Sequence, residues 1–329
     1  MRLIALLFAL VMLSLPARAE TPTLTVYTYE SFVSEWGPGK AIADAFQADC
    51  GCKLDFVSVE DAAGLLSRLK LEGDRTRADI LLGLDTSLTQ EAAATGLLAP
   101  HGLDLSPLRL PVAWHDPLFV PLDYGFFAFV YDKTRVKNPP ASFEELARSN
   151  LKIVIQDPRT STPGLGLLLW IKALYGEEAS AMWQRLKPHI VTVTRGWSEA
   201  YGLFLKGEAD MVLSYTTSPA YHRIAEEDDR YEAALFEEGN YMQVEVAAML
   251  ARSKQPELAR KFLAFMLTPG FQGAIPTGNW MYPTIALADG LPQGFDPPLA
   301  GDRALSLGPD RVAEARKAWI AEWLATFAD

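Results

Sequence analysis

The residues best suited to chemistry lie in the stretch QDPRTSTPGLGLLLW, residues 156–170. Ser161 and Thr162 precede Pro163, which favours the first turn of a helix, and the run then becomes apolar. A helix that begins here presents unpaired backbone N–H groups beside two hydroxyls, a combination that binds anions. The same residues would also form an ordinary capped helix, so the pattern alone leaves both interpretations open.

Aromatic residues form a second group with binding chemistry, because their faces attract flat or cationic groups. A single aromatic residue is more often part of a core, but several of these fall where predicted strands end, and polar residues follow one of them. The group comprises Tyr29, Trp36, Trp197, Tyr215 with Thr216, Thr217 and Ser218, Tyr221 and Trp280. Asp61 and Asp85 also follow predicted strands, where each could pair with a positive charge or serve as a cap or turn residue.

Motifs for catalysis are missing from the sequence. It contains no G-x-S-x-G, no H-E-x-x-H, and no glycine-rich nucleotide loop of either common type. Its four histidines are scattered without the spacing of metal ligands. The pattern therefore favours binding over catalysis and predicts neither a metal nor a cofactor.

Strands and helices alternate in the first part of the chain. Strands are predicted over 24–29, 52–59 and 78–84, and helices over 39–50 and 60–73. This alternation is typical of a parallel sheet with helices on both faces.

The remainder of the chain repeats this rhythm around two long strands. Strands are predicted over 119–132, 151–157, 189–194, 211–221 and 241–250; the first of these could be one strand or two, and the strand over 211–221 runs out into a polar, aromatic loop. Helices are predicted over 138–149, 163–176, 196–210, 256–267 and 309–327, with Ser142 as the cap of the first and Ser198 as the cap of the third.

We therefore predict an α/β fold of two lobes, each a mainly parallel sheet flanked by helices. Residues 20–122 plus 245–329 would form the first lobe, with the C-terminal helices free to cross over, and residues 123–244 the second. Ligands of such sheets bind beyond the carboxyl ends of the strands, which here means the cleft between the lobes. Closure would bend the long strands near 120–130 and 240–250.

The N-terminus predicts export. Arg2 precedes an apolar run that is too short to span a bilayer, and Ala17-Arg18-Ala19 forms an A-x-A site, so residues 1–19 would be a signal peptide cleaved after Ala19. Losing Arg2 and Arg18 would change the formal charge from −11 to −13. A chain with this net charge is unsuited to binding nucleic acid, and its electrostatic field mildly favours the approach of cations.

The chain has two cysteines, Cys50 and Cys52. Export to an oxidising compartment favours a disulfide between them, although their close spacing implies strain; free thiols or a metal site are the alternatives.

Several long stretches resemble the periplasmic thiamine-binding proteins of bacterial ABC importers. They are TVYTYESFVSEWGPG, VPLDYGFFAFVYD, QDPRTSTPGLGLLLW, TRGWSEAYGLFLKGEAD, VLSYTTSPAYH and PTGNWMYP, and the similarity extends to the ADCGC pair. The resemblance implies a two-lobed type II periplasmic binding fold that binds thiamine, thiamine monophosphate and thiamine diphosphate. It also implies a periplasmic monomer that delivers its ligand to an inner-membrane permease driven by an ATPase.

Carried over by position, the family's ligand contacts fall on Asp61 and Ala62, on Ser161 and Thr162, on Trp197, and on Tyr215, Thr216, Thr217 and Ser218. Aromatic packing against the rings would match Tyr29, Trp36, Tyr221 and Trp280. Ala62 departs from the glycine expected there, and a backbone contact survives that change if its φ is negative. Thiamine would account for both chemistries, since its cationic rings suit aromatic faces and a carboxylate, and the phosphate of its esters suits a helix start.

Two other functions remain open at this stage. Thiaminase I has the same fold and degrades thiamine through a cysteine, but no cysteine here falls near the predicted cleft. A different solute, such as an iron complex or a polyamine, is the other alternative.

Overall fold

The computed structural model describes residues 21–327, so the predicted signal peptide and its cleavage site lie outside the described residues. Strands β1 (Thr23–Tyr29), β2 (Lys53–Val59) and β3 (Ile80–Asp85) are parallel, in the order β2-β1-β3. Helices α2 (Gly39–Cys50) and α3 (Ala62–Glu72) connect them. The predicted alternation in this part of the chain is confirmed.

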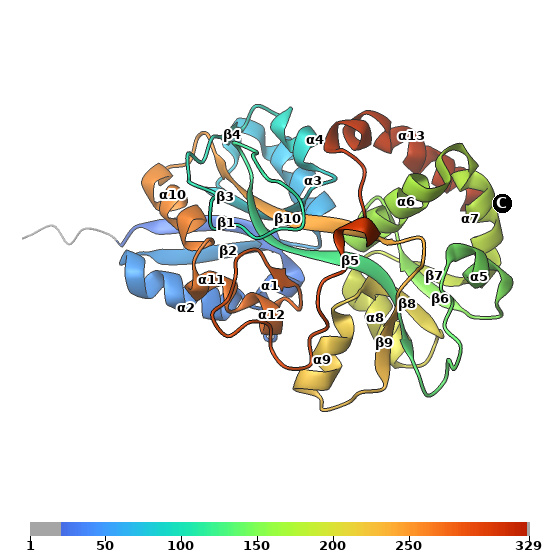
Figure 1. Cartoon of the computed structure of the whole chain (residues 1–329). Coiled ribbons are helices and arrows are strands. Elements are labelled where there is room, and N and C mark those ends of the chain that lie inside the picture. The colour runs from blue at the N-terminus through green and yellow to red at the C-terminus, as the bar shows by residue number, and fades with distance from the viewer. Residues whose placement is uncertain (1–20, 328–329) are drawn as a thin grey trace, which may run out of the picture.

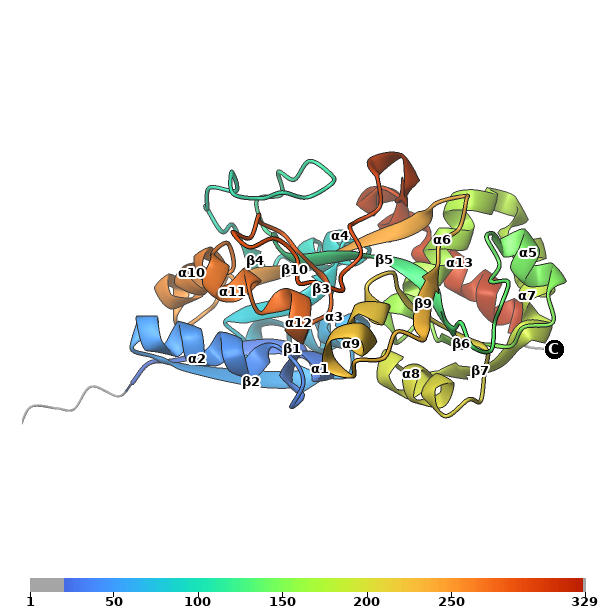
Figure 2. The ribbon, with the colours of Figure 1, turned by 60° about the horizontal axis from the view of Figure 1, so that its bottom comes forward.

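Two long strands join this parallel group to a second one. β10 (Asn240–Leu250) pairs antiparallel with β3 and with β5 (Val120–Asp132), and β5 pairs antiparallel with β8 (Met211–Tyr215). Beyond β8 lie β6 (Ile153–Gln156) and β7 (Ile190–Thr194), both parallel to it in direction. Figures 1 and 2 show β5 and β10 running through the middle of the molecule, with one parallel group on each side.

Helices flank the two groups, and short strands extend the sheet. The other elements are α1 (Glu30–Val33), α4 (Thr89–Ala93), β4 (Leu98–Ala99), α5 (Phe143–Arg148), α6 (Thr162–Tyr175), α7 (Ala179–Leu186), α8 (Trp197–Leu205), α9 (Ser218–Ala225), β9 (Tyr231–Ala234), α10 (Pro256–Phe265), α11 (Pro269–Gln272), α12 (Ile275–Gly278), β11 (Tyr282–Pro283), β12 (Ala304–Leu305) and α13 (Pro309–Phe327).

Three local predictions need correction. The strand predicted over 211–221 ends at Tyr215, and α9 begins at Ser218 in place of a loop, because Pro219 suits the first turn of a helix. Ser198 does not cap α8: Gly196 occupies the cap position, and the helix begins at Trp197. Helix α7 was not predicted, although its apolar stripe has helical spacing: Ala179, Met182, Trp183 and Leu186 are buried.

The C-terminal helix α13 packs against helices of the second parallel group. Lys172 of α6 is buried and donates a hydrogen bond to Glu322 of α13 at 2.7 Å. Trp323 packs edge-on against Trp183 of α7, with ring centroids 6.4 Å apart. The other end of α13 reaches α4, so this helix contacts both groups (Figure 1).

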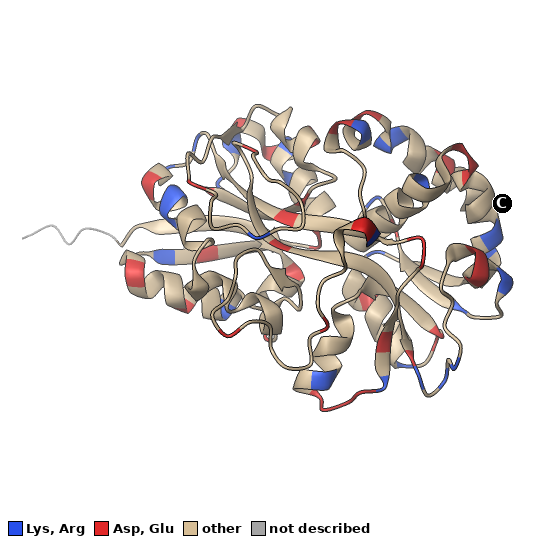
Figure 3. Cartoon of the chain, in the orientation of Figure 1, with Lys and Arg blue, Asp and Glu red and all other residues tan. Residues whose placement is uncertain are grey.

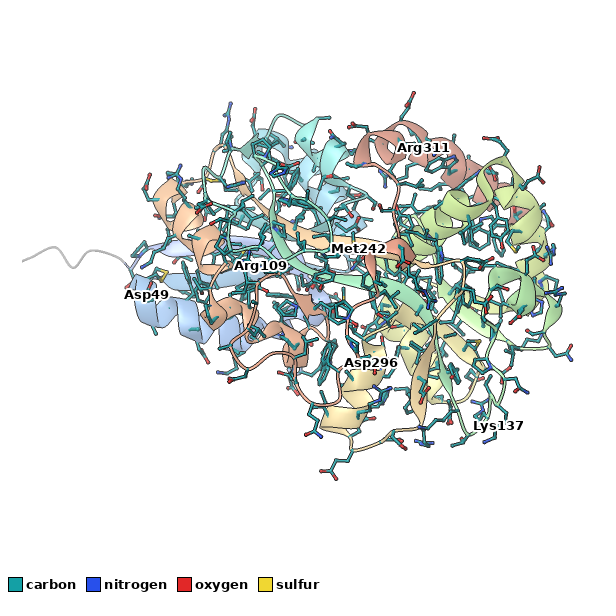
Figure 4. All side chains as sticks on the ribbon, viewed as in Figure 1. Asp49, Arg109, Lys137, Met242, Asp296 and Arg311 are labelled. Carbon is teal, nitrogen blue, oxygen red and sulfur yellow. A yellow bond between two sulfur atoms is a disulfide. The ribbon has the colours of Figure 1, made fainter. Side chains whose placement is uncertain are left out.

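The core fills both faces of the central strands. Every residue of β5 and of β10 is buried, which is why both read as long apolar runs. Met242 of β10, labelled in Figure 4, lies near the middle of the molecule, between the two groups. At the periphery, a disulfide joins Cys50 and Cys52 just after α2.

Candidate functional site

A cavity of about 510 Å³ lies between the two parallel groups, and loops from both contribute to it. Most of the lining residues are aromatic or acidic. They are Tyr29, Glu30, Ser31, Trp36, Glu60, Asp61, Pro163, Gly196, Trp197, Ser198, Glu199, Tyr201, Gly202, Leu205, Tyr215, Ser218, Tyr221, Glu245, Asn279, Trp280 and Met281. We refer to this cavity as the cleft.

The floor of the cleft is a hydrogen-bonded acidic network. Tyr29 donates from its hydroxyl to Glu245 Oε2 at 2.7 Å and accepts from Asn279 Nδ2 at 2.8 Å. The same amide nitrogen of Asn279 lies 2.6 Å from Asp123 Oδ2. Gln243 Nε2 contacts Glu245 Oε1 at 3.3 Å and Tyr215 Oη at 3.2 Å. The network thus ties Glu245 to both parallel groups.

The carboxyl groups of this floor have no cation beside them. None of the residues lining the cleft is lysine or arginine. Burial raises the pKa of Glu245 well above its usual value, and the nearby charge of Asp123 raises it further. Burial also raises the pKa of Asp123. A cation that entered the cleft would relieve this repulsion, so the floor suits a positively charged ligand.

Tyr29 can occupy the floor because of the glycine opposite it. A Cβ at Gly83 of β3 would lie 2.2 Å from the Tyr29 ring, and Gly83 has a φ of +98°. Any other residue would clash with the ring and strain the backbone. Gly83 therefore leaves the space in which the phenol reaches Glu245.

One wall of the cleft is built around Trp197, at the start of α8. Its Nε1 donates to Ser214 Oγ at 2.7 Å, and Ser214 Oγ lies 2.7 Å from Ser218 Oγ. The ring packs against Tyr201 at 5.0 Å and faces Trp36 of the other parallel group at 6.3 Å. Trp36 is 47% exposed, so its indole ring presents apolar surface to solvent beside the cleft.

Trp280 forms part of the opposite wall in an unusual backbone conformation. Its φ is +56°, which is rare for a bulky residue and is found mainly where the surroundings hold it in place. Its ring stacks on Phe295 at 6.5 Å and meets the edge of Tyr221 at 5.2 Å. The two parallel groups thus meet here through aromatic rings as well.

The predicted anion site at the start of α6 contains a carboxylate of this chain. Asp61, from the other parallel group, accepts hydrogen bonds from the Thr162 amide at 2.9 Å and the Thr162 hydroxyl at 2.7 Å. It also caps its own helix α3 by accepting from the Ala62 amide at 2.8 Å. Burial raises the pKa of Asp61, and these bonds to Thr162 and Ala62 oppose that rise. Ser161 holds the cap position of α6 without a side-chain capping bond.

The predicted site residues divide into two sets. Those that line the cleft are Tyr29, Trp36, Asp61, Trp197, Tyr215, Ser218, Tyr221 and Trp280; those adjacent to it but not lining it are Ala62, Ser161, Thr162, Thr216 and Thr217. Asp85 does not line the cleft: it is buried on β3 opposite Glu245 of β10 and accepts from the Ser87 amide at 2.7 Å, as a turn residue does.

The residues that sequence reasoning missed include Glu245, Tyr201 and Met281. Glu245 did leave a signal, because a lone carboxylate interrupts the apolar run YMQVEVAAML. Asn279 stood out in the stretch PTGNWMYP beside Trp280, but its partners Tyr29 and Asp123 lie far away in sequence, so its place in the network could not be predicted.

Other kinds of site find no support among residues 21–327. Within that range, no group of three or more His, Cys, Asp or Glu side chains is placed to hold a metal ion. A helix of sufficient length and apolarity to cross a membrane is likewise lacking there. Of the residues lining the cleft, none is cysteine or histidine.

Comparisons with known proteins agree on one group. Residues 38–273 match the family described as bacterial extracellular solute-binding protein. The thiamine-binding periplasmic protein of Escherichia coli (strain K12) is 56% identical over 304 residues, 92% of each chain. That of Salmonella typhimurium is 56% identical over 316 residues, 95% of this chain and 96% of the relative. The solved structure of a periplasmic thiamin binding protein superimposes with a TM-score of 0.90 at 55% identity, covering 93% of this chain and 96% of that one.

Proposed function

This chain belongs to the bacterial extracellular solute-binding proteins and, within them, to the family of thiamine-binding periplasmic proteins, and on that premise we propose that it captures thiamine and its phosphate esters in the cleft. It acts in the periplasm as a monomer, after cleavage behind Ala19, and delivers its ligand to an inner-membrane ABC permease that an ATPase drives. The type II periplasmic binding fold predicted from the sequence is the fold of this chain.

The observation that carries the proposal is the pairing of a cation-free acidic floor with aromatic walls. The thiazolium ring of thiamine is cationic and its aminopyrimidine is flat, so aromatic faces and a carboxylate complement both rings. The hydroxyethyl or phosphate end of the ligand extends toward Asp61 and the start of α6. There Ser161 supplies a hydroxyl, and the donors of Ala62 and Thr162, which bond Asp61 in the empty cleft, would exchange that carboxylate for the ligand; Thr216 and Thr217 lie behind Tyr215.

Capture requires the two lobes to close over the ligand. The lobes comprise 20–122 plus 245–329, and 123–244, with α13 crossing over to the second. Contacts already join them across the cleft: Asp61 with Thr162, and Glu60 with Arg195 at 2.8 Å on the exposed rim. Bending of β5 and β10 between the lobes would open the cleft to solvent and release the ligand.

The ligand leaves unaltered in this proposal. A nucleophile of the thiaminase I type is unsupported, because Cys50 and Cys52 form a disulfide at the end of α2, outside the cleft. Incubating the protein with thiamine overnight should return intact thiamine by mass spectrometry. A cleaved pyrimidine would show catalysis instead.

Calorimetric titration tests the choice of ligand. The panel is thiamine, its mono- and diphosphate, ferric citrate and spermidine, each added to the ligand-free chain. The proposal expects the three thiamine forms to bind in preference to the others. Tighter binding of iron or spermidine would assign the cleft to another solute.

Trp197→Ala should weaken thiamine binding by roughly 10- to 100-fold, because it removes an aromatic wall that clusters with Tyr201. Calorimetry measures the affinity, and the change in tryptophan fluorescence on binding should shrink with it. Trp319→Phe on α13 is the matched control, since Trp319 lies outside the cleft and should leave both readouts unchanged. Equal affinities in the Trp197 variant and the parent would remove this residue from the site.

Asp61→Asn should change the preference among the thiamine forms. In the parent, a phosphate that approaches the start of α6 meets the Asp61 carboxylate already bonded to Thr162. Asparagine still caps α3 but carries no charge, so the phosphate esters should gain roughly tenfold or more relative to thiamine. The ratio of dissociation constants is measured by calorimetry in parent and variant. An unchanged ratio would place the phosphate elsewhere.

A further inference from the structure

A second cavity of about 210 Å³ lies apart from the cleft. It is enclosed by α3, α4, α13 and the loop that precedes α6. Its lining residues are Ala63, Leu66, Ser67, Lys70, Glu91, Arg159, Arg316, Lys317 and Ile320, none of which lines the cleft. Figures 1 and 2 show α3, α4 and α13 meeting on one side of the molecule.

Positive charge dominates this cavity although the whole chain is acidic, with a formal charge of −11. Four of its lining residues are lysine or arginine and one is a carboxylate. That carboxylate, Glu91, is shared, because it accepts from both Lys70 and Arg316. Figure 3 shows basic and acidic positions interspersed along α13, so the excess arises from convergence and not from a basic helix.

The cations in the cavity are only partly compensated. Arg316 is the most enclosed, with its side chain 18% exposed, and burial lowers its pKa against the opposing charge of Asp85. Burial and the neighbouring charge of Arg316 both lower the pKa of Lys70. Arg159 is bonded to Asp157, with Nε 2.9 Å from Oδ1, and remains 53% exposed. An added anion would relieve the repulsion between Arg316 and Lys70.

We propose that this cavity binds a small tetrahedral oxyanion, of which inorganic phosphate is the probe. The guanidinium groups of Arg159 and Arg316 keep N–H donors beyond those that bond Asp157 and Glu91, and these can meet phosphate oxygens, while two ammonium groups add charge. The apolar side chains of Leu66 and Ile320 back the site and reduce its contact with water, which strengthens charge-assisted bonds. The volume is several times that needed for one water molecule.

Titration of the ligand-free chain with phosphate tests the site. The heat of binding and the rise in Tm with phosphate are compared with those in sodium chloride of equal ionic strength, because salt screening alone affects both measurements. The double variant Lys70→Gln/Lys317→Gln should bind phosphate roughly tenfold or more weakly, since it removes two charged donors and leaves Arg316 to pair with Glu91. The control Lys40→Gln/Lys53→Gln also removes two lysine charges, at exposed positions that do not line the cavity, and should behave like the parent.

Two further outcomes decide the matter. The first is binding of phosphate in the cleft, at the start of α6. Ser161→Ala would then abolish the response and the double lysine variant would keep it, which overturns the proposal. A response no larger than that to chloride also overturns it. Thiamine affinity of the double variant should equal that of the parent, because neither lysine lines the cleft, and this equality verifies that the variant is folded.

Discussion

Replacing Glu245 by glutamine should weaken thiamine binding by about 10- to 100-fold, the effect of losing a charged partner from a largely buried pair. Glu245 is 8% exposed and is the carboxylate on the cleft floor that Tyr29 and Gln243 orient. Glutamine has nearly the same shape and can still accept from Tyr29. The change therefore removes charge and leaves the cleft filled.

The same residue makes binding depend on pH. Burial and Asp123 raise the pKa of Glu245 in the empty cleft, whereas a bound thiazolium would lower it by favouring the ionised form. Binding then releases protons wherever the empty cleft holds them, so affinity should fall as pH is lowered from about 8 to about 5. Calorimetry in buffers of different ionisation enthalpy measures the released protons directly, and Glu245→Gln should release fewer.

Stability of the ligand-free chain should change in the opposite direction. A carboxyl whose pKa is raised by folding contributes stability below its unfolded pKa and loses that contribution as pH rises through its folded pKa. Glu245→Gln removes this loss, so the variant should have the higher Tm at pH 8, and the difference should shrink toward zero near pH 4.5. Thermal unfolding across this range measures it.

A conservative change outside the cleft controls both measurements. Glu257→Gln alters an exposed carboxylate of α10 that bonds Arg260, and it should leave the proton release intact. If Glu245→Gln bound thiamine as tightly as the parent at every pH, the acidic floor would have no part in recognising the cation.

Periodicity and capping patterns predicted the alternation of strands and helices within each parallel group, because parallel βαβ units leave long apolar strands and capped helices in the sequence. Ser142 illustrates the capping signal: it accepts from the Glu145 amide at 3.0 Å, as predicted. Helix α9 shows the limit of this approach. Only Thr216 and Thr217 separate α9 from β8. Because β8 is buried almost to its end, the sequence showed no change of pattern at Tyr215, where the strand ends.

The site was harder to predict than the fold, because its contacts join residues far apart in sequence. The start of α6 was recognisable as an anion site, but Asp61, which occupies it, is 101 residues away. Glu245 and Asp123 lie on neighbouring strands, and their mutual repulsion exists only after β5 and β10 pair. Chemistry that a single loop carries is visible in sequence, whereas chemistry created by strand pairing is not.

Trp170→Ala should destabilise the chain by about 4 kcal/mol and lower Tm by about 10 °C. The Trp170 ring is fully buried in α6, 4.8 Å from Phe143 and 5.1 Å from Phe236, and its Nε1 donates to Gly239 O at 3.0 Å. Alanine would leave a large void and an unpaired carbonyl. Trp319→Ala, on the more exposed α13, should cost about 1 kcal/mol or less, and equal losses would contradict this account.

The shape of the unfolding curve of Trp170→Ala also tests how the lobes cooperate. The side chains around Trp170 all come from the proposed second lobe, yet β5 and β10 pair with strands of both lobes, and one apolar cluster runs from Leu65 of α3 to Trp170. Shared strands transmit a loss in one lobe to the other, so calorimetry should show one transition that moves as a whole. Two transitions, of which only one shifts, would mean that the lobes unfold independently and that β5 and β10 act as flexible connections between them.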